Sequence, residues 1–385
     1  MTQAFPSTKT VFSSEEKLSW LRLSRTQNIG PITFYKLIEI YGTATKALEA
    51  LPELSQKGGR KKPLTAPSLS NVEKEYNALK KLGGDMVCAG EDAYPISLAA
   101  TDDAPPILSY IGDINIARAP CLGIVGARNA SLNGRKFTYK LAKELGQAGQ
   151  IVVSGLARGI DTAAHEGALE TGTIAVVAGG IDIVYPRENQ KLYEDICQRG
   201  LVIAESPLGT EPAARLFPKR NRIVSGLSTG VIVMEATIKS GSLITARMAG
   251  EQGRDVYAIP GYPGDPRAAG PNKLIQDGAT LVTRAQDVLH NLENFTSSSM
   301  GNTLFDSAPQ ATPDLTLVDN SMAEKDTQTI RQTLIKHLSQ MPIGVDELSR
   351  SCHLSVSDMQ MALLEMELAG RLSRLPGNRI VLIDE

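Results

Sequence analysis

Residues 151–169 read IVVSGLARGIDTAAHEGAL, and this stretch decides the fold class. Residues 151–154 are mostly β-branched, a glycine-containing turn follows, and helical sequence rich in alanine begins near residue 160. A continuous apolar strand that passes through glycine into a helix is typical of a parallel sheet buried on both faces. We therefore expect an α/β domain in which the turn lies at the carboxyl edge of the sheet, where ligands bind in such folds.

The same pattern recurs on both sides of this stretch. Most of the other apolar runs are also continuous and rich in Val and Ile rather than alternating, as expected for buried parallel strands. The predicted strands are 122–125, 151–154, 173–178, 201–204, 231–235, 256–259 and 280–282. They predict an extended Rossmann-like parallel sheet with helices on both faces.

Two smaller modules are expected to flank this domain. Residues 1–85 predict an N-terminal helical module that resembles a SAM or helix-hairpin-helix domain, and the Rossmann-like domain then covers 86–295, with its core from about 105. Residues 296–324 are polar and contain two prolines, which indicates a linker. Residues 325–385 predict three helices and a hairpin with its turn at 376–378, which together indicate a winged helix.

Composition limits the functional classes. The net charge is −2 and the isoelectric point is about 6.2, so any contact with nucleic acid must come from a local patch. The four cysteines lack zinc or redox spacing, and no run of 18 apolar residues suggests a membrane span. We expect a cytoplasmic protein with no metal and no cofactor.

The loops after the predicted strands combine glycine, a hydroxyl or a cation, and the start of a helix. Glycine lets backbone amides approach a ligand, and a helix N-terminus adds unpaired donors with a positive dipole end. Full positive charges come from Arg128, Arg158, Lys219, Arg220 and Arg222. Several such loops on one edge predict a groove that binds a row of phosphates, with an affinity that falls as salt rises.

Other interpretations of these loops remain open. Asp161 could simply cap its own helix, and His165 is more often a hydrogen-bonded structural histidine than a metal ligand. The first turn lacks a complete G-x-G-x-x-G, which disfavours NAD. Ser154, Asp161 and His165 have the residue types of a catalytic triad but no G-x-S-x-G motif, while a hydrolase that uses Glu235 remains possible.

Four ordered motifs resemble one family. GAR at 126–128, SGLARGIDTAAHEGAL at 154–169, FPKRNRIVSGLS at 217–228 and MEATIKSGSLITA at 234–246 closely resemble the DNA-processing protein A (DprA/Smf) family. The resemblance implies an extended Rossmann fold that binds single-stranded DNA and forms a homodimer. It also implies a non-enzymatic role in natural transformation (competence), in which the protein protects incoming DNA and loads the RecA recombinase for DNA recombination.

The resemblance also implies the contact residues. Arg128 would be the leading phosphate contact and Phe217 would stack on a base. The full set carried over by the matching motifs is Arg128, Ser154, Gly155, Arg158, Gly159, Phe217, Lys219, Arg220, Asn221, Arg222, Ser240, Gly241 and Ser242.

Two rival functions are kept. One is a nucleotide-processing enzyme of a related Rossmann fold, such as a phosphoribohydrolase, which release of free base from nucleoside monophosphates would reveal. The other is a partner-binding scaffold without affinity for DNA.

The two flanking modules lack features that DNA-binding modules of these types use. Pro31 removes one backbone donor from the helix-hairpin-helix-like turn at 27–32, so we expect a structural or partner role there. The expected recognition helix, 355–370, carries three acidic residues and no Lys or Arg. Because a helix in the major groove needs positive charge or amides that face the bases, this module is predicted to serve protein contacts.

Overall fold

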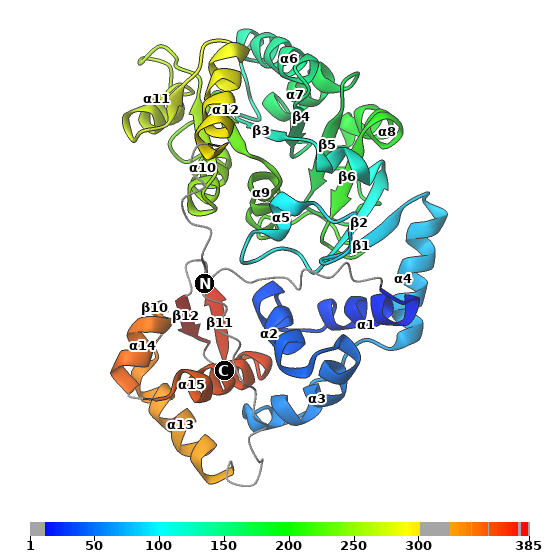
Figure 1. Ribbon diagram of the computed structural model, residues 1–385, viewed down its shortest axis with the longest axis vertical. Coiled ribbons are helices and arrows are strands. Elements are labelled where there is room, and N and C mark those ends of the chain that lie inside the picture. Colours follow the sequence, from blue (N-terminus) through cyan, green and yellow to red (C-terminus); the bar gives the residue numbers. More distant parts are fainter. Residues whose placement is uncertain (1–11, 301–323, 340, 353, 376–378, 384–385) are drawn as a thin grey trace. The chain divides into compact units, whose positions relative to one another are not determined.

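The computed structural model describes residues 12–300, 324–339, 341–352, 354–375 and 379–383. The chain forms two compact units (Figure 1): one contains residues 1–13 and 70–304, and the other contains residues 14–69 and 305–385. The second unit therefore draws on two segments from opposite ends of the sequence.

The first unit is built on a nine-stranded sheet with the spatial order β1-β2-β6-β5-β4-β3-β7-β8-β9. Neighbouring strands from β3 to β9 pair in parallel, whereas β1 and β2 extend the β6 edge in antiparallel fashion. The strands are β1 (Asp85–Cys88), β2 (Ile107–Gly112), β3 (Cys121–Val125), β4 (Ile151–Ser154), β5 (Thr173–Val177), β6 (Leu201–Ala204), β7 (Gly230–Val233), β8 (Asp255–Ala258) and β9 (Thr280–Leu281). The predicted fold class is confirmed.

The sequence pattern did not predict β1 and β2. Every residue of β3 to β7 is buried, which explains why those strands appear as continuous apolar runs. Strand β2 instead changes from buried to exposed along its length, and β1 is a short edge strand. Neither therefore stands out as a continuous run.

Helices cover both faces of the sheet. Helices α6, α7 and α12 share one buried core with side chains of β3, β4 and β7, while α9 and α10 pack together on the opposite face. The helices of this unit are α4 (Leu69–Lys81), α5 (Ile96–Ala99), α6 (Leu132–Gln147), α7 (Ile160–Ala168), α8 (Gln190–Arg199), α9 (Leu216–Leu227), α10 (Gly241–Glu251), α11 (Ala269–Gln276) and α12 (Ala285–Met300), with 3-10 turns at Ile114–Arg118 and Arg187–Asn189.

The chain reverses its direction across the sheet at β3. From β3 it runs through β4 and β5 to β6 on one side, and it then returns to place β7, β8 and β9 on the other side. The topological switch point of this sheet therefore lies between β3 and β7, which is where nucleotides bind in doubly wound folds.

The second unit contains the helical and winged-helix modules. Its N-terminal helices are α1 (Ser14–Ser24), α2 (Pro31–Tyr41) and α3 (Ala44–Lys57), with Trp20 and Phe34 packed edge to face at 4.8 Å between ring centroids. Pro31 is the first residue of α2, where a missing amide proton costs the helix nothing.

The C-terminal segment has the elements of a winged helix. They are α13 (Glu324–His337), β10 (Ile343–Gly344), α14 (Val345–Cys352), α15 (Val356–Leu368), β11 (Leu372–Leu375) and β12 (Arg379–Leu382), and the strand order is β10-β12-β11. The predicted turn at 376–378 lies outside the described residues. Within the predicted linker 296–324, residues 296–300 belong to α12 and residue 324 begins α13, and residues 301–323 lie outside the described ones.

Among the described residues, no helix combines the length and the apolar character that a bilayer crossing requires.

Candidate nucleic-acid interface

Three segments of the first unit meet around the Phe217 ring. The guanidinium carbon of Arg128, which follows β3, lies 4.8 Å from the centroid of that ring in a cation–π arrangement. The ring of Tyr185, which follows β5, lies 6.0 Å away at an angle of 54°. Phe217 itself is in the first turn of α9. We call these three side chains the Arg128–Phe217–Tyr185 cluster.

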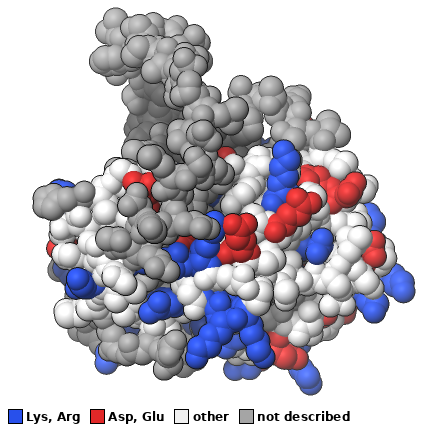
Figure 2. Space-filling view, turned by 90° about the horizontal axis from the view of Figure 1, so that it is seen from below, with Lys and Arg blue, Asp and Glu red and all other residues white. Residues whose placement is uncertain are grey.

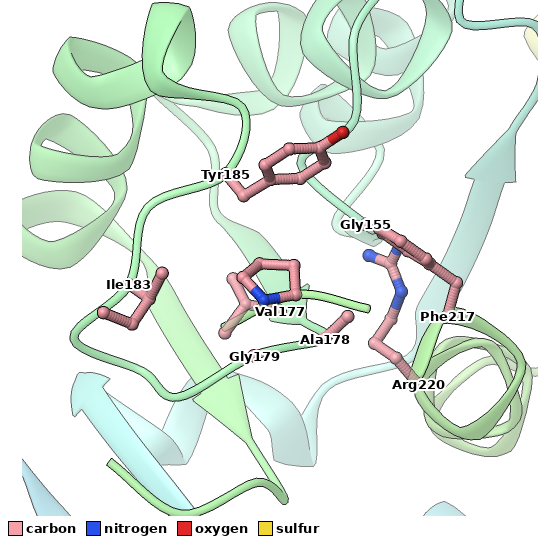
Figure 3. Close-up of a pocket in the computed structure, with 9 residues that line it drawn as sticks. Gly155, Val177, Ala178, Gly179, Ile183, Tyr185, Phe217 and Arg220 are labelled. Atoms are coloured by element: carbon pink, nitrogen blue, oxygen red, sulfur yellow. The ribbon is translucent and has the colours of Figure 1, made fainter. Parts of the chain in front are cut away.

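A small pocket opens beside this cluster (Figure 3). Only about one water molecule fits inside it, and its lining combines aliphatic and aromatic side chains with the Arg220 guanidinium. The lining residues are Gly155, Val177, Ala178, Gly179, Ile183, Tyr185, Pro212, Phe217 and Arg220. This space is far smaller than a base, so a base would lie over the mouth of the pocket and not inside it.

Arg220 supplies the positive charge within the pocket. Its side chain is buried, and its Nη1 atom donates to the backbone carbonyl of Val176 at 2.5 Å. Burial lowers its pKa to about 10, although the nearby carboxylate of Asp161 opposes the shift. Arg220 therefore remains a cation at neutral pH, fixed beneath the strand ends.

Gly155 makes room for this guanidinium. A Cβ atom on Gly155 would lie 1.8 Å from Nη1 of Arg220. The absence of a side chain here therefore serves the packing of Arg220, whereas we expected it to serve the approach of a ligand.

The loop after β4 is held in a strained conformation. Leu156 has a φ of 57°, in the left-handed region that a branched side chain rarely adopts. Oδ2 of Asp161 accepts from the amides of Gly155 at 3.1 Å and Ala157 at 3.3 Å. The carbonyl of Leu156 accepts from Nδ2 of Asn189 at 2.9 Å.

These bonds turn the loop amides inward. The amides of Gly155 and Ala157 are therefore engaged within the loop, and a ligand contact at Gly155 stays a prediction. Asp161 acts within the loop, in agreement with the interpretation that it caps local backbone groups.

His165 completes the buried network. Its Nδ1 atom lies 2.7 Å from Oγ1 of Thr173, which already donates its proton to the carbonyl of Val152, and Nε2 accepts from the amide of Leu156 at 3.3 Å. These partners assign the neutral tautomer with the proton on Nδ1. His165 is thus a hydrogen-bonded structural histidine. Among the described residues, no group of three His, Cys, Asp or Glu side chains could hold a metal ion.

The remaining predicted contact residues divide into exposed and buried ones. Arg128 and Lys219 are exposed, and Arg158 is exposed but paired with Glu188 at 2.8 Å. Ser154 is fully buried and donates to the carbonyl of Ile124 at 2.6 Å.

Arg222 is engaged in contacts within the fold. It is buried, and it pairs with Glu205 at 2.5 Å and bonds to the Asp103 backbone. We give Ser154 and Arg222 roles in the fold rather than in direct contact with a ligand.

The start of α10 lies next to α9. The carbonyl of Gly241 accepts from Nδ2 of Asn221 at 3.4 Å, and the hydroxyls of Ser240 and Ser242 lie 2.7 Å apart. Nothing lies within 4 Å of the position of a Cβ on Gly241, whereas the amide of Ser242 is capped by the Ser240 hydroxyl at 3.4 Å. Gly159 differs, because its φ of 78° and its approach to the carbonyl of Ala127 make it a packing residue of the β4 loop.

A carboxylate occupies the topological switch point. Oε2 of Glu235, after β7, accepts from the amide of Ser131 at 2.7 Å, and its Oε1 bonds to the Ser131 hydroxyl. A Cβ on Gly134, in the first turn of α6, would lie 2.7 Å from this carboxylate. The helix N-terminus that would hold a nucleotide phosphate in a doubly wound fold is therefore filled by the chain itself.

Two contributions were missed from the sequence. Tyr185 was not among the predicted contact residues, although an aromatic residue shortly after the Gly179-Gly180 turn was the available signal. The switch-point role of Glu235 had no local signal, because its partner Ser131 is 104 positions away.

Charge is mixed on the surface. Figure 2 shows Lys and Arg interspersed with Asp and Glu on the displayed face, with Lys and Arg gathered toward its lower edge. Local groups rather than overall charge must therefore attract an anionic ligand.

Comparison with known proteins identifies the family. The model for DNA recombination-mediator protein A matches residues 85–293, which is more than half of the chain. The chain belongs to this family. The DprA-like N-terminal HHH domain matches residues 14–78, and the DprA winged helix domain matches residues 318–378, so the predicted resemblance is confirmed.

Several relatives of the recombination-mediator family cover much of the chain. Protein Smf of Escherichia coli K12 is 35% identical over 316 residues, which is 80% of each chain. DNA processing protein DprA of Streptococcus pneumoniae is 46% identical over 205 residues, covering 53% of this chain and 72% of the relative.

Two solved structures of DNA processing protein A are also similar. The one from Streptococcus pneumoniae has a TM-score of 0.61 at 34% identity and covers 73% of this chain and 98% of its own. The structure from Helicobacter pylori concerns the single-stranded DNA binding mode of that protein. It has a TM-score of 0.50 at 30% identity, and the match covers 55% of this chain and 96% of the Helicobacter pylori chain.

The environment of His165 predicts a pH effect on stability. Burial, and to a lesser extent Arg220, lowers the pKa of His165 from 6.5 to about 3. The unfolded chain then binds more protons than the folded one between these values, so stability falls as the pH drops below about 6.5, by up to about 1.4 kcal/mol per pH unit. The free energy of unfolding, measured with urea at pH 7, 6 and 5, should change less with pH in His165→Gln than in the wild type. His290→Gln is the control, because His290 is exposed, and it should behave as the wild type. Equal slopes in all three proteins would contradict the assignment.

Gly155→Ala tests the packing of Arg220. The new methyl group should displace the guanidinium from Val176 and Asp161, and the free energy of unfolding should fall by about 1–3 kcal/mol, as for other overpacked sites. Gly250→Ala is the control, because that glycine lies in α10 with nothing within 4 Å of its Cβ position. Equal free energies of unfolding for Gly155→Ala and Gly250→Ala would contradict the close packing of Arg220 against Gly155.

Proposed function

We propose that this chain binds single-stranded DNA at the Arg128–Phe217–Tyr185 cluster, as a non-catalytic mediator of recombination. The observation that carries the proposal is the Arg128 guanidinium above the Phe217 ring, beside the small pocket that Phe217 helps to line. Cations beside aromatic faces are the combination that single-strand binders use for the phosphate chain and for the bases.

The side chains at this edge of the sheet would make two kinds of contact, with phosphates and with bases. Arg128 and Lys219 are exposed cations for phosphates, and the N-terminus of α10 adds a positive dipole end at the exposed Gly241. Phe217 and Tyr185 offer aromatic faces for stacking. Arg220 keeps a positive potential within the pocket while it holds the β4 loop.

The aromatic rings of the cluster favour single strands over duplex. A ring can stack only on an unstacked base, and a base in a duplex is stacked on both sides and paired. Bringing such a base onto these rings costs a few kcal/mol of unstacking and unpairing, a cost that is smallest for an already single-stranded base.

The buried network argues against turnover at this site. Asp161 and His165 are engaged with the β4 loop, and Ser154 is bonded to a strand carbonyl. Glu235, the carboxylate of the rival hydrolase hypothesis, is bonded to Ser131. These contacts favour a binding protein over the phosphoribohydrolase-like alternative, which release of free base from nucleoside monophosphates would support.

The finer biological role rests on the family. The proposal includes homodimer formation, protection of incoming DNA and loading of RecA on that DNA during natural transformation. The support is the recombination-mediator family and the relatives named as DNA processing proteins. A cytoplasmic location belongs to the same proposal, and it agrees with four cysteines that form no disulfide.

Charge and stacking variants should separate the two kinds of contact. Lys219→Ala and Arg128→Ala should each weaken binding of labelled oligo-dT and reduce the slope of log affinity against log salt by about 0.7, the value for one phosphate of a single strand. Phe217→Ala should weaken binding by about 5- to 150-fold, equivalent to about 1–3 kcal/mol, with little change in slope.

Lys143→Ala is the matched control for these variants. Lys143 is an exposed cation in the second half of α6, away from the strand ends. Fluorescence anisotropy across a salt series measures the oligo-dT affinity of the wild type and of the four variants, with duplex of the same length as competitor. Binding that stays at the wild-type level in Arg128→Ala, Lys219→Ala and Phe217→Ala would rule out this interface.

A further inference from the structure

Helix α15 is apolar on two opposite sides. Met359, Ala362, Leu363 and Met366 face the core of the winged-helix module. Leu364 and Leu368, one turn apart on the other side, are no more than 1% exposed although they lie outside that core. A helix that is apolar on two opposite sides must be covered on both, so a second surface has to cover Leu364 and Leu368.

The N-terminal helices of the same chain provide this cover. Gly58, which follows α3, approaches α15 so closely that its Cβ would lie 1.9 Å from the carbonyl oxygen of Glu365. Asn28 Nδ2 donates to the carbonyl of Leu368 at 3.4 Å, and Nζ of Lys36 on α2 donates to the side chain of Gln360. Helices α3 and α15 belong to one compact unit (Figure 1).

The acidic residues of α15 are neutralised within the winged-helix module. Glu365 pairs with Arg331 at 3.3 Å, and Glu367 pairs with Arg374 at 3.5 Å. Both glutamates are buried. The side of the helix that meets DNA in a winged-helix reader therefore carries buried leucines and paired carboxylates, and neither recognises base edges or phosphates.

We propose that the outer side of α15 is a docking surface for the chain's own N-terminal module, residues 14–69, and not for duplex DNA. The two ends of the chain then form one body that flanks the Rossmann-like unit in sequence. The family's winged helix serves in this chain as an internal scaffold. This inference does not depend on the proposed function of the Arg128–Phe217–Tyr185 cluster.

A glycine pair in the full chain tests the docking. Gly58→Ala places a methyl group against the backbone of α15, whereas Gly30→Ala is the matched control, because nothing lies within 4 Å of that Cβ position and its φ is −88°. Hydrogen exchange followed by mass spectrometry should show exchange in α15 and in α3 at least about tenfold faster in Gly58→Ala, and unchanged in Gly30→Ala.

A charge exchange provides the second arm. Gln360→Lys opposes two ammonium groups at the Lys36 contact and should speed exchange in both helices, whereas the double variant Gln360→Lys with Lys36→Glu should restore protection. Restoration distinguishes a direct contact from general destabilisation of α15.

Three outcomes would overturn the inference. The first is α15 protection that is unaffected by both Gly58→Ala and Gln360→Lys. The second is protection of α15 that falls on dilution of the wild type, which would make a second copy the occupant. The third is a 20-base-pair DNA duplex that cross-links to α15 in the wild-type chain. Oligo-dT affinity tests the proposed function separately, so the docking of α15 and the DNA interface can each be refuted without the other.

Discussion

The carboxylate of Asp161 organises the carboxyl edge of the sheet. It accepts from two amides of the β4 loop and lies near the buried cation of Arg220. Burying either charge alone would be costly, and each offsets the cost of the other. Leu156 keeps its left-handed conformation because the bonds around it leave no relaxed alternative. The position of α9, and with it Phe217, follows from this anchor.

A consequence concerns how the edge differs from a nucleotide site of the same fold. In doubly wound folds the ligand enters at the switch point, here between β3 and β7. Glu235 closes that entrance by bonding to Ser131. The exposed cations and aromatic rings instead lie around the ends of β3 and β5 and the start of α9. A chain of phosphates can pass over such an open edge, whereas a single mononucleotide finds its customary position already filled.

The sequence predicted the architecture well and the site in part. Apolar runs identified β3 to β9, and the signal was strongest for β3 to β7, whose residues are all buried, while β1 and β2 left little signal. The proximity of Arg128 and Phe217 follows from loops that share one sheet edge. The roles within the run Lys219–Arg222 could not be predicted, since adjacent cations on a helix face different sides and composition does not tell which side is buried. Gly155 was assigned to a ligand because the sequence does not show the Arg220 side chain that lies against it.

The discontinuous second unit has a consequence for synthesis of the chain. Asn28 and Leu368 are separated by 340 positions, and the whole Rossmann-like unit lies between them. At about 5–20 residues per second, translation leaves the first three helices without their C-terminal partner for roughly 15–70 seconds. Closing so long a loop adds little entropic cost, because that cost grows only with the logarithm of loop length. The delay instead sets an order of maturation, in which the central unit completes its core before the two ends of the polypeptide can join.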